Sequence, residues 1–289
     1  MTGPPTLRVV TLNAGTLFEP GWEQRRAEQA AWLDELDPDV VCLQELWRDD
    51  AHPCTAEWLV EHTDADWHWT FGGFPFPEEL GAAQDLLFGS AILSHWPIDH
   101  HELHALPVDE AAADPMWRTR FELLHVVTAG AHVFSTHLAA PPAQAYHRVR
   151  QALFVDEIIR TAVDRRPSTM VPLLCGDFNA EPDSDEIRFL TSRATIDGRS
   201  TYYQDAWRSG GRTDPGYTGD PRTNPLCASF HVPPKRLDYV FVGDPWGRDG
   251  AGVVEHVDLA FHEPRTGVLA SDHYGLVVDV AWPAKPERP

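Results

Sequence analysis

Positively charged residues are scarce in this chain of 289 residues. The sequence contains 23 Lys and Arg against 44 Asp and Glu, which leaves a formal net charge of −21 at pH 7. Proteins that bind the backbone of nucleic acids normally carry a basic face, because Lys and Arg replace its condensed counterions. The shortage therefore disfavours a long polyanion or an anionic membrane surface as a partner. A cation held in a cleft can reverse the local sign, so phosphate chemistry stays open.

Long apolar runs, a leader sequence and closely spaced cysteine pairs are also missing. No run approaches the roughly 20 apolar residues that span a bilayer, and the N-terminus lacks a basic segment followed by an apolar stretch. We therefore expect no transmembrane segment, no signal peptide and a cytoplasmic protein. None of the four cysteines forms a C-x-x-C pair, which disfavours a cysteine zinc site. Cys42 and Cys175 lie in apolar runs and are predicted to be core residues, whereas spacing does not decide whether Cys54 and Cys227 pair.

What the chain contains is an ordinary globular composition, with 43% hydrophobic and 23% charged residues. Short apolar runs alternate with helical patterns and Pro/Gly loops, without an internal repeat. We predict one α/β domain with its core at about 7–281 and a flexible tail at 282–289. Several strands follow one another too closely for crossover helices, so a purely parallel, doubly wound sheet is disfavoured.

Hydrophobic periodicity locates most of the expected elements. Strands are predicted at 7–13, 40–43, 88–93, 121–127, 132–136, 171–175, 237–242 and 276–280, and helices at 22–36 and 143–163, with a short helix beginning near Asp183. The aromatic segment 71–77 is interpreted as a surface loop. The segment that contains His100, His101 and His104 is interpreted as solvated chain rather than as a second metal site.

Polar side chains gather at the ends of the predicted strands, where α/β proteins often place ligands and catalytic groups. These residues are Asn13, Glu45, His137, Asp177 and Asn179, together with Asp272 and His273 before the last strand and Asp238 within another. Each alone is explained equally well as a turn, cap or solvated strand end. Their joint appearance in segments spread over the whole chain favours a shared site.

The residue types in this set suit metal-assisted hydrolysis of a phosphoester. Carboxylate and amide oxygens are the ligands that Mg²⁺, Mn²⁺ or Ca²⁺ prefer, and they do not suit zinc. The histidines are then free for proton transfer, since a free imidazole titrates near pH 6.5. A buried carboxylate such as Asp238 would orient one imidazole and stabilise its charged form.

Seven motifs in the chain together resemble the endonuclease/exonuclease/phosphatase superfamily, which includes DNase I, AP endonucleases, inositol polyphosphate 5-phosphatases and neutral sphingomyelinases. The motifs are LNAG (12–15), LQE (43–45), GSAILSHWPI (89–98), STHL (135–138), GDFNAEPDS (176–184), KRLDYVF (235–241) and SDHYGL (271–276). They occur in the order typical of that family and span nearly the whole chain. The resemblance implies a DNase I-like four-layer α/β sandwich, in which two mixed β-sheets pack face to face with helices outside.

The resemblance also implies a role for each matched residue. Glu45 would be the principal Mg²⁺ ligand, with Asn13 and Asp272 on the same metal-binding side. Asp177 and Asn179 would position the attacking water and the phosphate. Asp238 would orient His273 as general base, and His137 would contact the scissile phosphate as donor or acid. Whether Asp177 or His273 takes the proton, and whether one or two metals act, stays open.

Two further segments bear on the substrate. His137 in STHL resembles the DNase I, 5-phosphatase and sphingomyelinase branches rather than the AP endonucleases. The loop GYTGDPRTNP (216–225) resembles the phosphatase and sphingomyelinase branches, but Gly219 replaces their usual aromatic residue, which weakens substrate roles for Thr218 and Asn224. Lys235 and Arg236 either supply charge for a phosphate or form a solvated pair.

The leading hypothesis is a Mg²⁺-dependent hydrolase that acts on a small-molecule or lipid phosphoester. One alternative is a DNase I-like nuclease that acts on DNA or RNA, since a metal site and a few local cations can suffice. A second alternative is a non-catalytic binding protein on the same fold.

Overall fold

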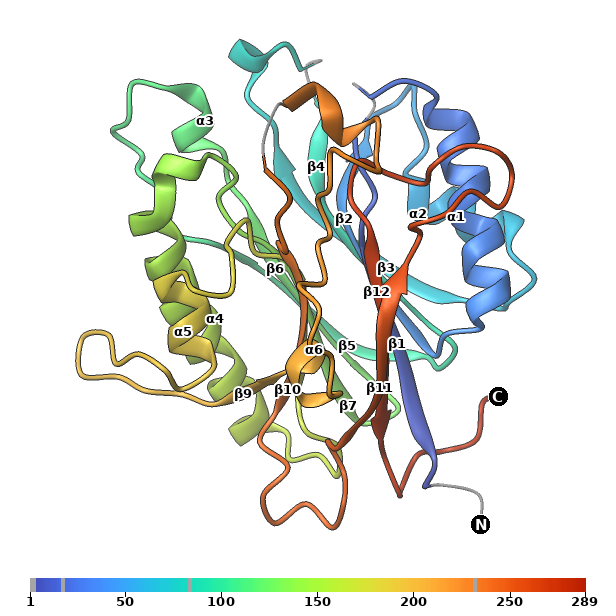
Figure 1. The fold of residues 1–289 in the computed structure, drawn as a ribbon, viewed down its shortest axis with the longest axis vertical. Coiled ribbons are helices and arrows are strands. Elements are labelled where there is room, and N and C mark those ends of the chain that lie inside the picture. The colour runs from blue at the N-terminus through green and yellow to red at the C-terminus, as the bar shows by residue number, and fades with distance from the viewer. Residues whose placement is uncertain (1–3, 17–18, 83–84, 231–232) are drawn as a thin grey trace.

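The computed structural model describes residues 4–16, 19–82, 85–230 and 233–289. Two six-stranded sheets lie face to face, and helices cover their outer faces (Figure 1). The predicted four-layer sandwich of two mixed sheets is therefore confirmed. The start of β1 and the C-terminal segment lie at one end of the sandwich, and β1 runs from there toward the opposite end.

The first sheet has the strand order β11-β12-β1-β2-β4-β3. Within it, β1 and β2 are parallel and the neighbouring pairs are antiparallel. Its strands are β1 (Thr6–Asn13), β2 (Val40–Arg48), β3 (His68–Pro75), β4 (Leu87–Ser94), β11 (Val254–Ala260) and β12 (Gly275–Ala281).

The second sheet has the order β5-β6-β7-β8-β10-β9, with β7 and β8 parallel and the other pairs antiparallel. Its strands are β5 (Ile98–Ala105), β6 (Glu122–Thr128), β7 (Ala131–His137), β8 (Leu173–Asp177), β9 (Tyr203–Asp205) and β10 (Asp238–Gly243). Each sheet thus contains one parallel pair, and its other pairs are antiparallel, which excludes a purely parallel fold.

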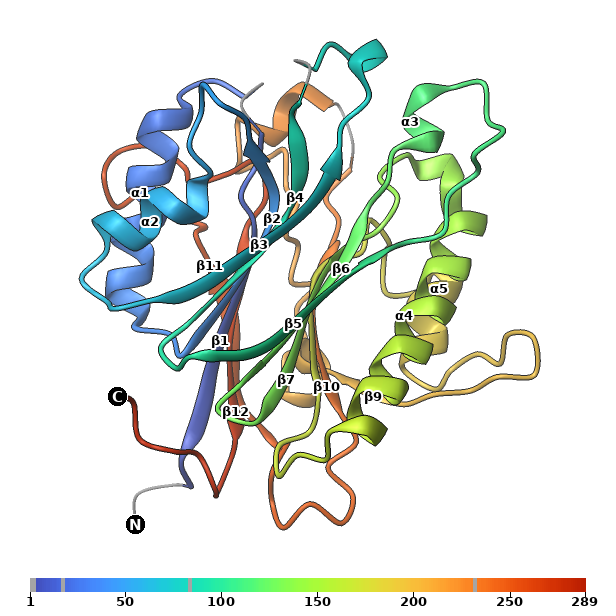
Figure 2. The ribbon, with the colours of Figure 1, turned by 180° about the vertical axis from the view of Figure 1, so that it is seen from behind.

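Helices α1 (Trp22–Leu36) and α2 (Thr55–His62) cover the first sheet, while α4 (Ala145–Arg165) and α5 (Asp185–Leu190) cover the second (Figures 1 and 2). The short helices are α3 (Pro115–Arg118), α6 (Ala206–Ser209), η1 (Glu78–Leu80), η2 (Pro142–Gln144) and η3 (Cys227–Phe230). Helix α4 buries Ala152, Val155 and Ile159, which recur at the spacing of three and four that predicts an amphipathic helix. Among the described helices, none combines the length and apolar character that crossing a membrane requires.

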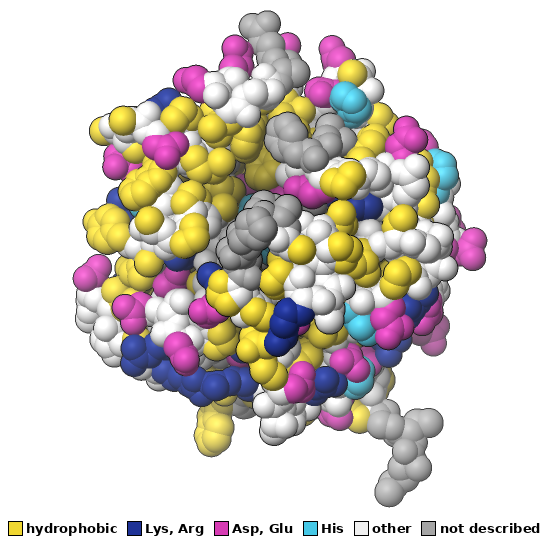
Figure 3. Space-filling model, turned by 45° about the horizontal axis from the view of Figure 1, so that its top comes forward, with side chains coloured by type: hydrophobic (Ala, Val, Ile, Leu, Met, Phe, Trp, Pro, Cys, Tyr) yellow, Lys and Arg dark blue, Asp and Glu magenta, His cyan; other side chains and the backbone are white. Residues whose placement is uncertain are grey.

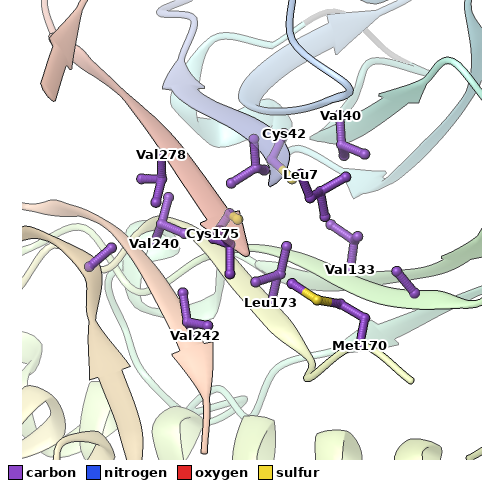
Figure 4. Close-up of a cluster of buried hydrophobic side chains, with 14 of the residues drawn as sticks. Leu7, Val40, Cys42, Val133, Met170, Leu173, Cys175, Val240, Val242 and Val278 are labelled. Carbon is purple, nitrogen blue, oxygen red and sulfur yellow. The ribbon is translucent and has the colours of Figure 1, made fainter. Parts of the chain in front are cut away.

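The core between the two sheets is made largely of aliphatic side chains from both, together with the tryptophans Trp96, Trp207 and Trp282 (Figure 4). Cys42 from β2 and Cys175 from β8 are fully buried in this core, so their prediction as core residues is confirmed. Cys54 and Cys227 are also buried, and all four cysteines are free thiols. The two sheets are therefore held together by packing and not by a disulfide.

Several elements differ from the sequence predictions. The loop predicted at 71–77 is wrong, because β3 extends through Pro75 and pairs with β4. The histidine-rich segment forms β5 rather than solvated chain. Sequence periodicity does not reveal β5, because its partly buried positions include His100, Glu102 and His104 instead of apolar residues. Helix α5 begins at Asp185, with Ser184 as its N-cap.

The C-terminal segment, for which composition predicts a flexible tail, makes specific contacts in the structure. Trp282 is buried in the core between the sheets. Lys285 Nζ lies 2.6 Å from Asp39 Oδ2, and Arg288 Nε lies 2.8 Å from Asp39 Oδ1. Asp39 directly precedes β2, so the charged tail has partners at the start of that strand.

Candidate active site

Three strands end at the same place between the two sheets. Asn13 is the last residue of β1, His137 the last of β7 and Asp177 the last of β8. In the register of β7 and β8, His137 lies opposite Asp177. Figure 3 views this end of the molecule and shows acidic side chains in a hollow that hydrophobic side chains flank.

Glu45 reaches this site through an irregularity in β2. The pairing of β2 with β4 shifts between Leu43 and Leu46, and Glu45 adopts a left-handed backbone conformation with φ of 59°. Such a bulge breaks the alternation of side chains along a strand and redirects one of them. Glu45 thereby contributes a carboxylate whose Oε1 is 2.9 Å from Asn13 Nδ2 and 3.7 Å from His137 Nε2.

The turn after β8 places Asp177 and Asn179 on either side of His137. Asn179 N donates to Asp177 Oδ1 at 2.8 Å, and Asn179 Nδ2 donates to His137 Nε2 at 3.0 Å. Gly176 allows Asp177 to come this close to β7, because a Cβ at Gly176 would lie 1.9 Å from the carbonyl oxygen of Thr136. Its φ of 141° also favours glycine. In the GDFN motif, the glycine therefore sets the backbone conformation that positions the side chains of Asp177 and Asn179.

Asp238 and His273 form a close polar contact in the site. His273 Nδ1 lies 2.8 Å from Asp238 Oδ2, and His273 Nε2 lies 3.9 Å from Asp177 Oδ2. Burial works against the charged imidazole, but Asp238 and Asp177 outweigh it and raise the pKa of His273 well above its ordinary value. Burial, together with Asp238, raises the pKa of Asp177. The pKa values of Asp177 and His273 are therefore both raised above their ordinary values.

Asn13 bridges two carboxylates through its amide nitrogen. Nδ2 donates to Glu45 Oε1 and to Asp177 Oδ2, each at 2.9 Å, while Oδ1 accepts from Gly15 N at 3.1 Å. The amide oxygen is thus already used by the backbone. This arrangement supports a role in holding the two carboxylates, whereas the predicted role as a metal ligand stays a prediction.

The carboxylates of the site fit a divalent cation. Glu45, His137 and Asp177 offer ligand atoms within 4.8 Å of one another. Burial, followed by the nearby charge of Asp272, raises the pKa of Glu45 to about 8. A carboxylate with a pKa this high lacks compensating positive charge, which Mg²⁺, Mn²⁺ or Ca²⁺ would supply. Asp272 contributes negative charge beside this group but lies outside the set of closely spaced ligand atoms.

His137 is a neutral imidazole in this structure. Burial lowers its pKa to about 4, and its Nε2 accepts the hydrogen bond from Asn179. To donate at Nε2 or to act as an acid, the ring must carry a proton on that atom, which an anionic phosphoryl oxygen beside it would favour. The two predicted catalytic histidines are therefore tuned in opposite directions.

Two side chains of the loop 216–225 hydrogen-bond the backbone of the segments that carry Asp238 and His273. Thr218 Oγ1 accepts from the backbone N–H of Asp238 at 3.2 Å, and Asn224 Nδ2 donates to the carbonyl of Ser271 at 2.9 Å. Both side chains are fully buried. Their observed contacts are with the protein backbone, so they hold Asp238 and the segment before His273 in place.

Arg236 does not form the solvated pair that was one alternative for it. Its guanidinium makes two hydrogen bonds to Asp205, at 2.8 and 2.6 Å, and both side chains are buried. Arg236 is therefore a structural cation. Arg25 was missed by sequence reasoning: its buried guanidinium donates to the carbonyl of Ala14 at 3.0 Å, directly after Asn13. Only its position inside a helix, far from any motif, was visible in the sequence.

Comparisons with known proteins agree with this geometry. The family model described as "Endonuclease/Exonuclease/phosphatase family" matches residues 10–273. Among curated proteins, none matches this chain in sequence.

Several solved structures share the fold. Truncated TDP2 from Caenorhabditis elegans is 18% identical with a TM-score of 0.68, covering 96% of this chain and 98% of that chain. D. rerio TDP2 complexed with single-strand DNA product is 17% identical with a TM-score of 0.65, covering 95% and 98%. The human Nocturnin catalytic domain with bound sulfate is 18% identical with a TM-score of 0.65, covering 97% and 96%. At these identities the likeness establishes the fold.

Proposed function

The chain belongs to the endonuclease/exonuclease/phosphatase family, and we propose that it uses Mg²⁺ to hydrolyse phosphoesters of small molecules or lipids. The observation that carries the reaction class is the His273 ring, held 2.8 Å from Asp238 and 3.9 Å from Asp177 beside the Glu45 carboxylate. This arrangement provides a base next to a place for a cation, which metal-assisted hydrolysis requires.

We assign the proton transfer to the pair of Asp177 and His273. A water molecule bound to both Asp177 Oδ2 and His273 Nε2 would lose its proton to this pair as its oxygen attacks phosphorus and the bond to the leaving group breaks. Asp238 holds His273 in the required orientation through Nδ1. Asn179 and His137 are adjacent donors for the phosphoryl oxygens, once His137 has gained a proton.

Glu45 is the principal residue that would hold Mg²⁺, with Asp272 adding negative charge on the same side. When bound, the cation supplies positive charge for the phosphoryl oxygens. Asn13 keeps Glu45 and Asp177 in place through its two hydrogen bonds. These role assignments are part of the proposal.

A groove beside the site supports a substrate with an apolar part. It has a volume of about 610 Å³. Its lining consists of Pro20, Gly21, Arg25, Thr223, Pro225, Leu226, His262, Glu263, Pro264, Gly267, Val268 and Leu269. Arg25 connects the groove to the site, because the same guanidinium contacts the backbone after Asn13. Proline and aliphatic walls favour an acyl chain or an aromatic group over the charged backbone of a nucleic acid.

The net charge of −21 supports the same choice of substrate. A long polyanion approaching this surface meets repulsion that a few local cations do not offset. A nuclease remains the competing function. A cytoplasmic location is part of the proposal and agrees with four free cysteines, which a reducing compartment preserves.

The experiment that tests this proposal is a substrate panel in Mg²⁺, with the Asp177→Asn protein as the blank. The panel contains sphingomyelin, phosphoinositides, sugar phosphates, an aryl phosphodiester, RNA and plasmid DNA. We expect hydrolysis of a small or lipid phosphoester that stops with EDTA and returns with Mg²⁺. Fast nicking of plasmid DNA without cleavage of the other compounds would overturn the substrate class. Failure to cleave any phosphoester would overturn the reaction.

A further inference from the structure

A second group of imidazoles lies on the other face of the second sheet. We call it the outer histidine cluster; it consists of His100, Glu102 and His104 from β5, His125 from β6 and His132 from β7. Successive side chains along β7 point to opposite faces of the sheet, so the cluster and the active site lie on different faces. Val133 faces the core between the sheets, whereas Phe134 packs in the cluster of side chains beneath α4. His132 therefore points away from His137 and its neighbours.

The strand register brings the cluster together. Glu102 lies directly opposite His125 in the pairing of β5 with β6. His100 Nε2 lies 2.9 Å from Glu102 Oε1, and His104 Nε2 lies 3.3 Å from Glu102 Oε2. His100, Glu102 and His125 each offer a ligand atom, and these three atoms lie within 4.8 Å of one another.

The hydrogen bonds of the cluster determine which nitrogen carries each proton. His132 Nε2 lies 2.7 Å from the carbonyl oxygen of Arg166, which can only accept, so this nitrogen is protonated. Burial lowers the pKa of His132, and the neutral ring then accepts at Nδ1. That atom lies 3.0 Å from His125 Nε2, which must be the donor.

The Nδ1 atom of His125 therefore lacks a proton and has no hydrogen-bond donor to accept from among the described residues. Its Nε2 carries the proton, and burial lowers the pKa of the ring to about 3, which keeps it neutral. Nδ1 of this fully buried side chain has no hydrogen-bond partner among the described residues. A buried lone pair without a partner is costly, so a site of this kind is explained best by a ligand that accepts electrons.

We propose that His100, Glu102 and His125 form a second metal site, which binds a zinc-type divalent cation. Two imidazoles and a carboxylate suit zinc, in contrast to the oxygen-rich active site. The hydrogen bonds from His125 through His132 to Arg166 are the kind of outer support that orients a metal-ligating histidine. His104 lies beside Glu102 but outside the set of closely spaced ligand atoms.

The cluster is open to solvent on one side, and its hydrogen bonds account for the proton that a bound ion would displace. The side chains of His100 and Glu102 are 24% and 34% exposed, so an ion can enter from solvent while His125 closes the inner side. Arg166 Nη2 lies 3.4 Å from His100 Nδ1 and can only donate, which places the proton of His100 on Nε2, facing Glu102. Metal binding replaces this proton and releases it to solvent.

The test is equilibrium dialysis of the full chain against Zn²⁺ in excess Mg²⁺, followed by metal analysis. The background carries Glu45→Gln to weaken binding at the active site. We expect about one zinc ion to be retained per chain. His100→Ala and Glu102→Gln in this background should each lower the zinc affinity at least about tenfold. His101→Ala is the matched control, because His101 is exposed on the opposite side of the same strand.

Substitution of Co²⁺ for Zn²⁺ gives a second readout that does not depend on activity. The visible absorption of bound Co²⁺ reports imidazole ligation, and it should disappear in His100→Ala and persist in His101→Ala. Failure of the background protein to retain zinc would overturn the proposal. Equal retention by His100→Ala and His101→Ala would overturn it as well. Neither result bears on phosphoester hydrolysis.

Discussion

Histidines lie beside both faces of the second sheet, and their surroundings tune them in opposite directions. On the inner side, His273 from the loop before β12 is largely shielded from solvent, yet its contact with Asp238 at 2.8 Å and the charge of Asp177 raise its pKa. On the outer face, His125 is also buried, but its hydrogen bond goes to the neutral His132, and its pKa falls to about 3. Burial alone therefore does not decide whether a histidine is charged.

His137 shows that the hydrogen-bond partner matters more than the location. It lies in the active site with His273, but its Nε2 faces an amide of Asn179 at 3.0 Å, and the carboxylates lie farther away, at 3.7 Å. Its pKa of about 4 is closer to that of His125 than to that of His273. A directly hydrogen-bonded carboxylate therefore suits a base, whereas neutral hydrogen-bond partners accompany the low pKa values of His137 and His125.

The largest effect should come from removing the inner base. We expect His273→Gln to lower kcat/KM by about 10²- to 10⁴-fold, since this is the usual contribution of a positioned acid or base. His101→Gln serves as the control, because this exposed side chain lies outside both histidine groups. Steady-state kinetics on the preferred substrate measure the ratio. Comparable rates in the two variants would remove His273 from the mechanism.

The charge tuning itself can be tested with Asp238→Asn. This change keeps the shape of the side chain but removes the charge that raises the pKa of His273. The unprotonated pair is the active base, so activity rises with pH through its pKa. Lowering that pKa should move the rising limb of the pH–rate profile to lower pH, together with a lower maximal rate. A limb that stays in place would contradict the assignment.

A smaller effect is expected from His132→Gln, which breaks the support behind His125. Loss of an outer hydrogen bond typically weakens metal binding by about 10- to 100-fold. We expect the zinc affinity of the Glu45→Gln background to fall by about tenfold, at the lower end of this range, because His100 and Glu102 remain. Dialysis against Zn²⁺ measures the change. An unchanged affinity would show that His132 does not orient His125.

The smallest effects concern two carboxyls with raised pKa, the partly exposed Glu45 and the buried Glu122. Burial raises the pKa of each to about 8 from 4.5. An acid with a raised pKa contributes fully to stability below about 4.5 and loses this contribution as pH rises through 8. At pH 8 without metal, Glu45→Gln and Glu122→Gln should each raise Tm by about 2–4 °C, and by less at pH 5.

Mg²⁺ should separate these two variants. Glu122 Oε1 accepts from Ser90 at 2.5 Å between the sheets, outside the closely spaced ligand groups, so its stabilisation should not depend on Mg²⁺. The gain from Glu45→Gln should disappear when Mg²⁺ is added, because the cation binds the wild-type carboxylate. Thermal unfolding with and without Mg²⁺ provides the comparison. A gain that persists for Glu45→Gln would argue against Glu45 as a metal ligand.

Much of the fold and of the candidate site can be predicted from the sequence. Helices α1 and α4 follow from the spacing of their apolar residues, and β1, β8 and β12 follow from continuous apolar runs. The eight proposed site residues lie in motifs whose order matches the family. The structure brings His137, Asp177, Asp238 and His273 within hydrogen-bonding or ion-pair reach of one another, as a shared site requires.

Other features could not be predicted, because they depend on neighbours that are distant in sequence. β5 has polar residues at its inward positions, so it lacks the apolar alternation by which a strand is recognised. The buried guanidinium of Arg236 is stabilised by Asp205, 31 residues earlier, which accepts two of its hydrogen bonds. Glu45 points into the site because its backbone adopts a left-handed conformation, which a glutamate in a predicted strand gives no reason to expect.

The sequence by itself determined the layered α/β architecture and the chemical types of the site residues, because hydrophobic periodicity and motif composition are local properties. Only the tertiary structure decided how each polar group is charged. Whether an imidazole such as His125 or His273 is neutral or protonated depends on the distance to its hydrogen-bond partner and on the loss of solvent around it. The packing of strands and loops sets both quantities. In this protein it places His273, from the loop before β12, beside Asp238 between the sheets, and leaves a free lone pair on His125 at the outer face of the second sheet.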